Sequence, residues 1–539
     1  MQGMTHTINA QITIRAPFNN KGRQPDVMTD EMLGRYLRQI TVSNALGEPS
    51  ARFTVEFTPE VVPGTGGLSM SQLIQPYSLV SIALHRGGSI RPGQPGHQAN
   101  TLSPKPMLLG IVDDLEESED YSEEAPRRDN ELSGRSLSGV LSDHRWWFHS
   151  FLAYSGQINL PPDIRDFFAV RPDDVLLRDE SSLRTLGFLA IDPHLFDVSG
   201  RTPAALMGTA WNFFVEGTAE RSPFIKCRWD SQTSLGRATN IGLSRLLRFD
   251  AEAAHRNYFD PAARMVNQYL GTELPDASCW DLLDYFSDEH FNELFSDTVG
   301  DNLHNAYVQV VSRKPPFAGH IEYINGHPRI RYSSGTQRPR EGQSLFDTSF
   351  GDWNLADETV EIDGSDVIAM PQLGRGVGEG TYNLYDVQPA VFANAGARTG
   401  DRMFQQEIPP IIDEILSSPS YVERVGIRPL RVASRSIPML DAVTNDAPRP
   451  VADLREHCLV YAALLREWHF RQPELWRGTY FLKGRTALRV GKRLLDKRSP
   501  DRWWEFYIRR VQHQITFEEQ PFYSTTVQVD RGWPINPGS

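Results

Sequence analysis

The chain has 539 residues and a formal net charge of −13 at pH 7. This length is too great for one hydrophobic core, so we expect about three or four domains. The acidic balance argues against a main role in gripping nucleic acid, and no run of ~18 apolar residues is present that could cross a membrane.

The N-terminus and the cysteines indicate folding inside a cell. The first residues have neither a basic start nor an apolar stretch of the kind that a secretory signal needs. The three cysteines are scattered, and two lie beside aromatic or apolar residues, so we expect buried thiols rather than a disulfide framework. We therefore predict assembly in a cytoplasm.

The N-terminal part reads mainly as β-strands. Phe53, Val55 and Phe57 alternate with polar residues, which is typical of a half-buried strand. The predicted elements are strands at 8–14, 53–57, 77–84 and 107–115, a helix at 29–37, long loops at 63–71 and 87–106, and a strand that turns into a helix over 131–143.

The middle of the chain reads as largely helical from 144 to about 300. Thr202 can cap a helix that begins at Pro203. Beyond it the pattern predicts helical segments at 278–286 and 291–297, a strand at 307–317, short strands within 352–370, a glycine loop at 374–380, a strand at 382–387 and a helix at 409–416.

The C-terminal part begins with a helix, because apolar residues recur at steps of four and three. These residues are Leu454, Cys458, Tyr461, Leu465 and Trp468. Strands follow in 476–495, 506–515 and 523–532, and the first of these stretches is broken by glycines at spacings suited to strand ends and bulges.

This C-terminal order resembles the last module of tailed-bacteriophage baseplate hub proteins, the late control gene D family. The pattern is a long helix, then G-T-x-x-L-x-G-R-x-x-L-R-x-G, then F-Y-I-x-x-V-x-H, then Y-x-T-T-V-x-V-x-R-G. Thr486 departs from it, since we expect proline after Gly-Arg. The matching residues are Gly478, Thr479, Leu482, Gly484, Arg485, Leu488, Arg489, Gly491, Tyr507, Val511, His513, Thr525, Thr526, Arg531 and Gly532.

Two further blocks resemble the same family. The first is a G-x-V-D-D strand followed by an acidic hairpin and a strand that ends in G-R-x-L; the second runs from W-D-L-L through N-E-L-F to R-x-P-P-F. Their matching residues are Gly110, Val112, Asp113, Asp114, Gly134, Arg135, Leu137, Trp280, Leu283, Asn292, Glu293, Leu294, Asp297, Arg313, Pro316 and Phe317.

Several other patterns could carry chemistry, and each has a simpler interpretation. The glycine loop has no following lysine or helix, as a phosphate loop would. The acidic stretch lacks a calcium-loop spacing and fits a solvated hairpin; its residues are Asp113, Asp114, Glu116, Glu117, Glu119, Asp120, Glu123 and Glu124. The histidines His144, His149 and His290 do not form the H-E-x-x-H zinc motif.

The carboxylate and aromatic pairs also have simpler interpretations. Glu289 and Glu293 lie one helical turn apart in the predicted helix, but with Asp288 and Asp297 they also describe a polar helix face. The tryptophan pairs 146–147 and 503–504 fit core or interface packing. We predict no enzyme activity, no catalytic, cofactor-binding or metal-binding residue, and no cofactor.

The resemblance implies a multidomain α+β fold with two tube-forming antiparallel β-barrel domains and a helix-rich peripheral insertion. The domains expected are 1–145 for the first barrel, 146–305 for a helix-rich middle, 306–440 for a mixed part that contributes to the second barrel, and 441–539 for a helix and the last barrel strands. We expect the second barrel to draw on the strand at 307–317 and on those of 476–532.

The function implied is that of a structural virion protein, the central hub of a phage tail baseplate or tail tip. Such hubs are homotrimers that join the hexameric tail tube to a trimeric central spike, and we expect tape-measure and other baseplate proteins as further partners. DNA would only pass through, along a channel that the acidic excess could line. Two alternatives stay open, the hub of a contractile injection or secretion system and a tail-associated peptidoglycan hydrolase.

Overall fold

The computed structural model describes most of the strands and several helices of the chain. The described residues are 8–15, 27–28, 37–58, 74–86, 105–120, 127–143, 145, 203–212, 215, 228–229, 241–251, 277–287, 292–301, 303, 305–313, 320–324, 327–331, 344, 358–375, 382–390, 423, 425–438, 451–471, 474–517 and 521–537.

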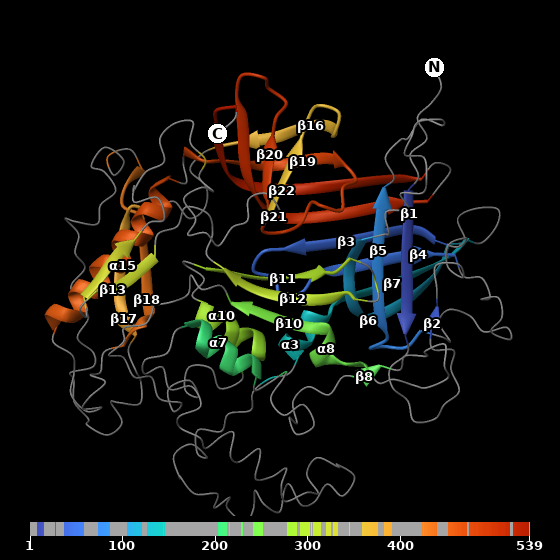
Figure 1. Cartoon of the computed structure of the whole chain (residues 1–539), viewed down its shortest axis with the longest axis horizontal. Coiled ribbons are helices and arrows are strands. Elements are labelled where there is room, and N and C mark those ends of the chain that lie inside the picture. The colour runs from blue at the N-terminus through green and yellow to red at the C-terminus, as the bar shows by residue number, and fades with distance from the viewer. Residues whose placement is uncertain are drawn as a thin grey trace, which may run out of the picture.

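A large, mainly antiparallel sheet of 13 strands dominates the fold (Figure 1). Its first strand set contains β1 (Ile8–Arg15), β3 (Leu37–Ala45), β4 (Arg52–Phe57), β5 (Leu79–Arg86), β6 (Lys105–Asp120) and β7 (Arg127–Ser136), with the short β2 (Val27–Met28) beside β1. Alternate residues of these strands form one core that includes Ile12, Ile40, Phe53, Ile82 and Leu132. The period of two places these apolar side chains on a common face.

The second strand set continues the same sheet. It contains β15 (Thr359–Ile362), β16 (Val367–Gly374), β19 (Trp476–Lys483), β20 (Arg493–Asp496), β21 (Trp503–Thr516) and β22 (Phe522–Ile535). Its core includes Tyr480, Leu494, Phe506 and Val527. The two sets are joined where β21 pairs with β3, from Arg510 opposite Ala45 to Thr516 opposite Gln39.

Both sets repeat one order of strand pairing, although the sequence has no repeat period. In the first set β3 pairs with β4, β4 with β7, β7 with β6, and β6 with β5. In the second set β16 pairs with β19, β19 with β22, β22 with β21, and β21 with β20. All these pairings are antiparallel, so β3 to β7 correspond in order to β16, β19, β20, β21 and β22.

A smaller sheet and several helices pack beneath the main sheet in Figure 1. The sheet consists of β10 (Leu247–Ala251), β12 (Tyr307–Arg313) and β11 (Glu293–Val299). It shares a core with α7 (Pro203–Trp211) and α10 (Cys279–Ser287), and with the short turns η1 (Leu137–Gly139) and α3 (Val140–Asp143) that follow β7. Nearby lie β8 (Arg228–Trp229), β9 (Ile241–Gly242) and α8 (Leu243–Leu246).

The long helix α15 (Val451–Arg471) belongs to a separate lobe, at the left of Figure 1. Its neighbours are the hairpin β13 (His320–Ile324) and β14 (His327–Arg331) and the parallel pair β17 (Leu384–Ala390) and β18 (Pro429–Pro438). The predicted stripe is confirmed at Cys458, Tyr461 and Leu465, which are buried against Tyr385 and Val387. Cys279 and Cys458 are both buried free thiols, as expected.

The structure corrects two predicted elements. The segment 291–297 is not helical where it is described, since Glu293–Val299 is the strand β11. The predicted helix at 29–37 lies mostly outside the described residues, but Leu37 opens the strand β3, which sequence reasoning missed. A bulge between Leu37 and Gln39 breaks the alternation that would have revealed this strand.

The composition of the second strand set also differs from expectation. The strand β12 pairs within the small sheet rather than with the strands of 476–532, although Val311 packs against their core. The middle of the chain contributes strands as well as helices, and the described residues as a whole are mostly β-structure with few helices. The helix predicted at 409–416 lies outside the described residues.

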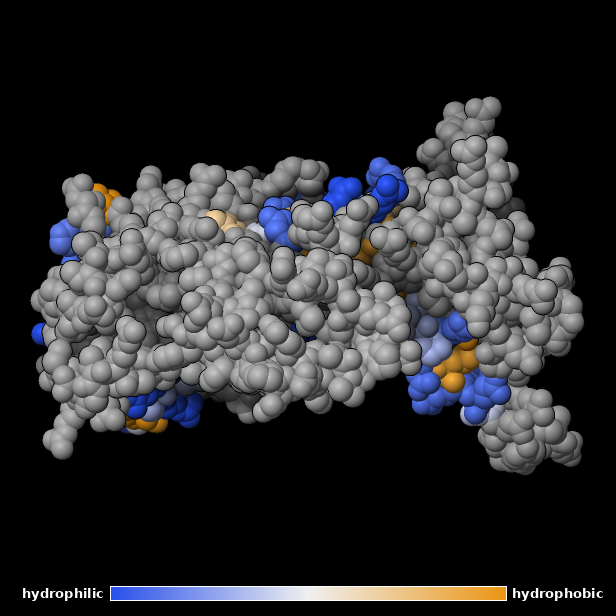
Figure 2. Space-filling model, turned by 90° about the horizontal axis from the view of Figure 1, so that it is seen from below, coloured by the Kyte–Doolittle hydropathy of each residue, from blue (hydrophilic) through white to orange (hydrophobic). Residues whose placement is uncertain are grey.

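The described path of the main sheet ends at β16 and β2, so closure into barrels and the domain boundaries stay predictions. On the face shown in Figure 2, described hydrophobic residues are visible as small separate spots among hydrophilic ones. No helix in the described ranges is long and apolar enough to cross a membrane.

Candidate functional site

Three arginines meet the acidic strand β11 at the centre of the molecule, and we name this cluster the arginine junction. It consists of Arg313, Arg489 and Arg531 together with Glu293 and Asp297. All five residues belong to the blocks that resemble the hub family. Their segments lie far apart in sequence, because 192 residues separate Asp297 from Arg489 and 238 separate Glu293 from Arg531.

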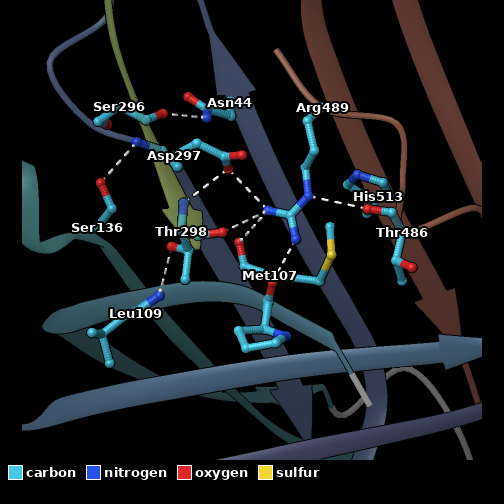
Figure 3. Close-up of polar contacts among 12 residues, drawn as sticks. Asn44, Met107, Leu109, Ser136, Ser296, Asp297, Thr298, Thr486, Arg489 and His513 are labelled. Atoms are coloured by element: carbon cyan, nitrogen blue, oxygen red, sulfur yellow. Dashed lines mark hydrogen bonds and ion pairs between the residues drawn. The ribbon is translucent and has the colours of Figure 1, made fainter. Parts of the chain in front are cut away.

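Arg489 is the most connected side chain of the junction (Figure 3). It lies in the loop between β19 and β20, and its Nη1 donates to Asp297 Oδ1 at 2.9 Å. The same Nη1 also reaches the carbonyls of Met107 and Thr298, while Nη2 donates to the Pro106 carbonyl and Nε to the Thr486 carbonyl. A guanidinium has five N–H donors in a fixed plane, so one side chain can tie three separate segments together.

Polar contacts around Asp297 attach β11 to the first strand set. The Leu109 amide donates to Thr298 Oγ1 at 3.1 Å, and Asn44 Nδ2 donates to the Ser296 carbonyl at 2.7 Å. The Ser138 hydroxyl donates to Ser296 Oγ at 2.8 Å. Buried polar groups are costly unless they are paired, so these contacts fix the position of β11.

Arg531 and Tyr507 bind the other acidic residue of β11. Arg531 Nη2 lies 2.5 Å from Glu293 Oε1, and the Tyr507 hydroxyl donates to Glu293 Oε2 at 2.5 Å. Burial alone would lower the pKa of Arg531, but the negative charges of Glu293 and Asp530 outweigh it and raise that pKa. Burial and the charge of Glu293 raise the pKa of the Tyr507 hydroxyl, which stays neutral and donates.

Arg313 reaches from β12 into the turn that precedes β20. Its Nη2 donates to the Gly491 carbonyl, and its guanidinium stacks on Phe295 with 5.1 Å to the ring centroid. Gly491 has φ +75°, and a Cβ there would lie 2.6 Å from Arg313 Nη2. The family-like glycine is therefore required both for its left-handed backbone and for the close approach of the arginine.

His513 lies buried next to the junction. Its Nε2 is 3.1 Å from the Leu488 carbonyl, and its Nδ1 is 2.9 Å from the Tyr523 hydroxyl. The carbonyl can only accept, so Nε2 carries the proton and Nδ1 accepts from Tyr523. Burial, reinforced by the positive charge of Arg489, lowers the pKa of His513 to about 3. The imidazole is therefore neutral and holds the 484–492 loop against β21.

The first family-like block forms a smaller cluster of its own. Arg135 donates from Nε to Asp113 at 3.1 Å and pairs with Asp143 at 2.5 Å. Burial is the main cause that raises the pKa of Asp113, and Arg135 opposes it. These residues fix the end of β7 to the α3 turn rather than joining the arginine junction.

Several candidate residues from the sequence analysis lie outside the part of the chain that the structure describes. The residues His144, His149, Asp288, Glu289, His290, Trp146, Trp147, Glu123, Glu124, Pro316 and Phe317, together with 376–380 of the glycine loop, lie outside the described residues. Glu293 is described, and it contacts Arg531 and Tyr507 on a strand. Trp504 packs edge-to-face on Trp476 with 5.4 Å between the ring centroids, which agrees with packing rather than an open platform.

The described part of the acidic stretch is an exposed hairpin face, as expected for Asp113, Asp114, Glu116 and Glu117. Within the described ranges no group of three or more His, Cys, Asp or Glu side chains is arranged to hold a metal ion. The groups that sequence reasoning missed are Asn44, Ser138, Ser296 and the carbonyls of Pro106 and Met107. Backbone acceptors have no sequence signature, so no pattern could have found them.

The arginine junction is a set of ion pairs and hydrogen bonds that holds separate segments together. Its arginines are held by carboxylates and carbonyls and are mostly buried, so removing one partner leaves a poorly solvated charge and costs about 1–3 kcal/mol. Such an arrangement fixes the small sheet, the first strand set and the second strand set in one geometry.

Comparison with known proteins gives structural neighbours only. The chain matches no protein-family model, and no curated protein sequence matches it significantly. Its structural neighbours are phage tail proteins and components of type VI secretion systems.

Three of these neighbours illustrate the range. A tail protein from Neisseria meningitidis MC58 is 9% identical with a TM-score of 0.40, covering 97% of this chain and 96% of that chain. The 43 kDa tail protein of prophage MuSo2 from Shewanella oneidensis is 10% identical with a TM-score of 0.41, covering 97% and 98%. A type VI secretion component of E. coli is 7% identical with a TM-score of 0.33, covering 98% and 77%.

Proposed function

We propose that the protein is a structural virion component, the central hub of a phage tail baseplate or tail tip. In this role three copies form a ring that joins the hexameric tail tube to the trimeric spike, and DNA passes through its channel. The observation that carries the proposal is the arginine junction, because it is built from residues of two separated blocks that resemble the hub family.

The repeated strand order supports the same role. A subunit with two similar strand sets can present six similar units when three copies assemble, which would match three-fold and six-fold partners. The arginine junction supports it further, since a ring that bears load between a tube and a spike needs its two strand sets held at a fixed angle. Neither feature requires catalysis.

The first test is the mass of the purified chain by light scattering, alone and mixed with the central spike protein of the same phage. A trimer, or a monomer that becomes a trimer when the spike protein is added, is the expected result. A stable monomer that ignores the spike protein would overturn the hub proposal. Clearing of a peptidoglycan suspension by the purified chain would instead favour the hydrolase alternative.

A further inference from the structure

Two strand edges on different parts of the molecule lack a neighbour among the described residues. The strand β16 pairs with β19 on one side only and ends the sheet. The strand β6 pairs with β5 only over residues 105–111, so beyond Asp114 its sole strand neighbour is β7. A two-stranded arm and an edge strand with one neighbour both invite pairing with a further strand.

The repeated strand order makes these two edges counterparts of a pairing that already exists within the chain. The strand β6 corresponds to β21, and β16 corresponds to β3. The distal part of β21, from Arg510 to Thr516, pairs with β3 and joins the two strand sets. The equivalent partners, distal β6 and β16, are the two edges without this strand neighbour in the part of the chain that the structure describes.

A bulge fixes the residue-by-residue equivalence of β6 and β21. Arg509 is the extra residue between Ile508 and Arg510 in the pairing of β21 with β22. Asp113 is the extra residue between Val112 and Asp114 in the pairing of β6 with β7.

The bulge residues make the same contact with opposite charges. Arg509 Nε lies 3.4 Å from Asp530 Oδ2, and Asp113 Oδ1 lies 3.1 Å from Arg135 Nε. Asp530 and Arg135 are themselves equivalent, because each lies opposite the residue two positions before the bulge residue, Tyr507 and Ile111. The two strands therefore align without ambiguity, with Leu115 at the position of Val511.

The strands β3 and β16 align in the same way. Phe53 of β4 and Gly478 of β19 are equivalent. Each of them pairs with a residue of the next strand, and that residue in turn pairs with the residue immediately before the bulge of β6 or β21. Val42 lies opposite Phe53, and Leu373 lies opposite Gly478. Both strands also have a register shift before the aligned residues, between Leu37 and Gln39 in β3 and between Ala369 and Gln372 in β16, and β16 has a second shift between Val367 and Ala369.

We infer that the distal part of β6 in one copy of the chain pairs antiparallel with β16 of the next copy. The internal pairing of Val511 with Asn44 and of Gln514 with Thr41 sets the register. It places Leu115 opposite Arg375 and Ser118 opposite Gln372 of the neighbouring copy. The inference rests on the proposed function, because it gives the contact by which the ring closes.

Charge and geometry select a second copy as the partner. In Figure 1 β16 lies at the top and β6 at the lower right, so the two edges face different directions in one chain. A contact between different surfaces of identical copies is heterologous and can close into a ring.

The distal part of β6 holds Asp114, Glu116, Glu117, Glu119 and Asp120, and Arg375 falls diagonal to Glu117. Pro371 has no N–H and ends the ladder on β16.

Cysteine cross-linking of the full chain tests the register. Ser118→Cys and Gln372→Cys are both at exposed positions, and directly opposite residues on paired strands lie close enough for a disulfide after a small adjustment. Mixing the two single variants under mild oxidation is expected to give a covalent dimer on a non-reducing gel. The double variant is expected to give a ladder that ends at the trimer.

The control pair is Ser118→Cys with Leu373→Cys, whose side chains point to opposite faces of the sheet and so should not cross-link. Equal cross-linking of the control pair, or cross-linking of Ser118→Cys with itself, would overturn the inferred register. A trimer by light scattering without any cross-link from Ser118 and Gln372 would overturn this pairing and leave the hub proposal standing. A monomer under all conditions would overturn both.

Discussion

The guanidinium of Arg489 lies 2.9 Å from the carboxylate of Asp297 and joins a loop of the second strand set to the small sheet. Only 12% of the Arg489 side chain and 20% of the Asp297 side chain are exposed. The same guanidinium reaches the carbonyls of Pro106 and Met107 on β6. The Arg489 side chain thus connects the small sheet, the first strand set and the second strand set.

Replacing Arg489 with methionine is expected to destabilise the protein by about 1–3 kcal/mol, because the mostly buried carboxylate of Asp297 loses its charged partner. Urea unfolding followed by tryptophan fluorescence measures the change. The matched control is Arg510→Met, which removes an arginine that is 47% exposed from its pair with Glu48, which is 38% exposed, and should cost about 0–1 kcal/mol. Equal losses for the two variants would contradict a special role for the junction.

Acidification is expected to destabilise the protein through His513. Its folded pKa is lowered to about 3, so between the unfolded value and pH 3 the unfolded chain binds a proton that the folded chain does not. This contribution is fully present above the unfolded pKa of about 6.5 and is lost as pH falls, by about 3 kcal/mol at pH 4.5. The variant His513→Gln cannot titrate, so its stability should fall less over this range. Parallel pH profiles of the two proteins would exclude this origin.

Proline at position 486 is expected to stabilise the protein. The Leu488 amide donates to the Arg485 carbonyl at 3.1 Å, so residues 485–488 form a β-turn with Thr486 at its second position. Proline is favoured there because its fixed φ suits the turn and restricts the unfolded chain, which is worth about 0.4–1 kcal/mol. Thermal unfolding of Thr486→Pro should show a higher midpoint. The control Ala487→Pro occupies the next position of the turn and should lower it.

A methyl group at Gly484 is expected to be harmful. A Cβ there would lie 2.0 Å from the ring of Tyr523, whose hydroxyl contacts His513. Forcing an atom into this contact should cost about 1–3 kcal/mol and loosen the loop that contains Arg489. Gly364→Ala is the control, since nothing lies within 4 Å of a Cβ at that turn. Equal midpoints in urea for the two variants would show that the ring can move aside freely.

Local pattern predicted the elements whose periodicity is regular. The alternation at Phe53, Val55 and Phe57 gave the strand β4, and the stripe at Cys458, Tyr461 and Leu465 gave the helix α15. The pattern failed where local and tertiary preferences disagree. Glu293, Leu294 and Phe295 suit a helix, yet pairing with β12 makes them a strand.

The sequence by itself determined which residues belong to the site, but not that they lie together in space. It singled out Glu293, Asp297, Arg313, Arg489 and Arg531 as parts of separate family-like blocks. Only the tertiary structure decided that they form one mostly buried junction, because ion pairs across some 200 residues depend on strand order and register rather than on local propensity. The repeated pairing order was equally hidden, since a sheet constrains which face a residue occupies and leaves its identity free. Arg509 with Asp530 and Asp113 with Arg135 fill equivalent positions with opposite charges, so residue identity does not reveal that they correspond.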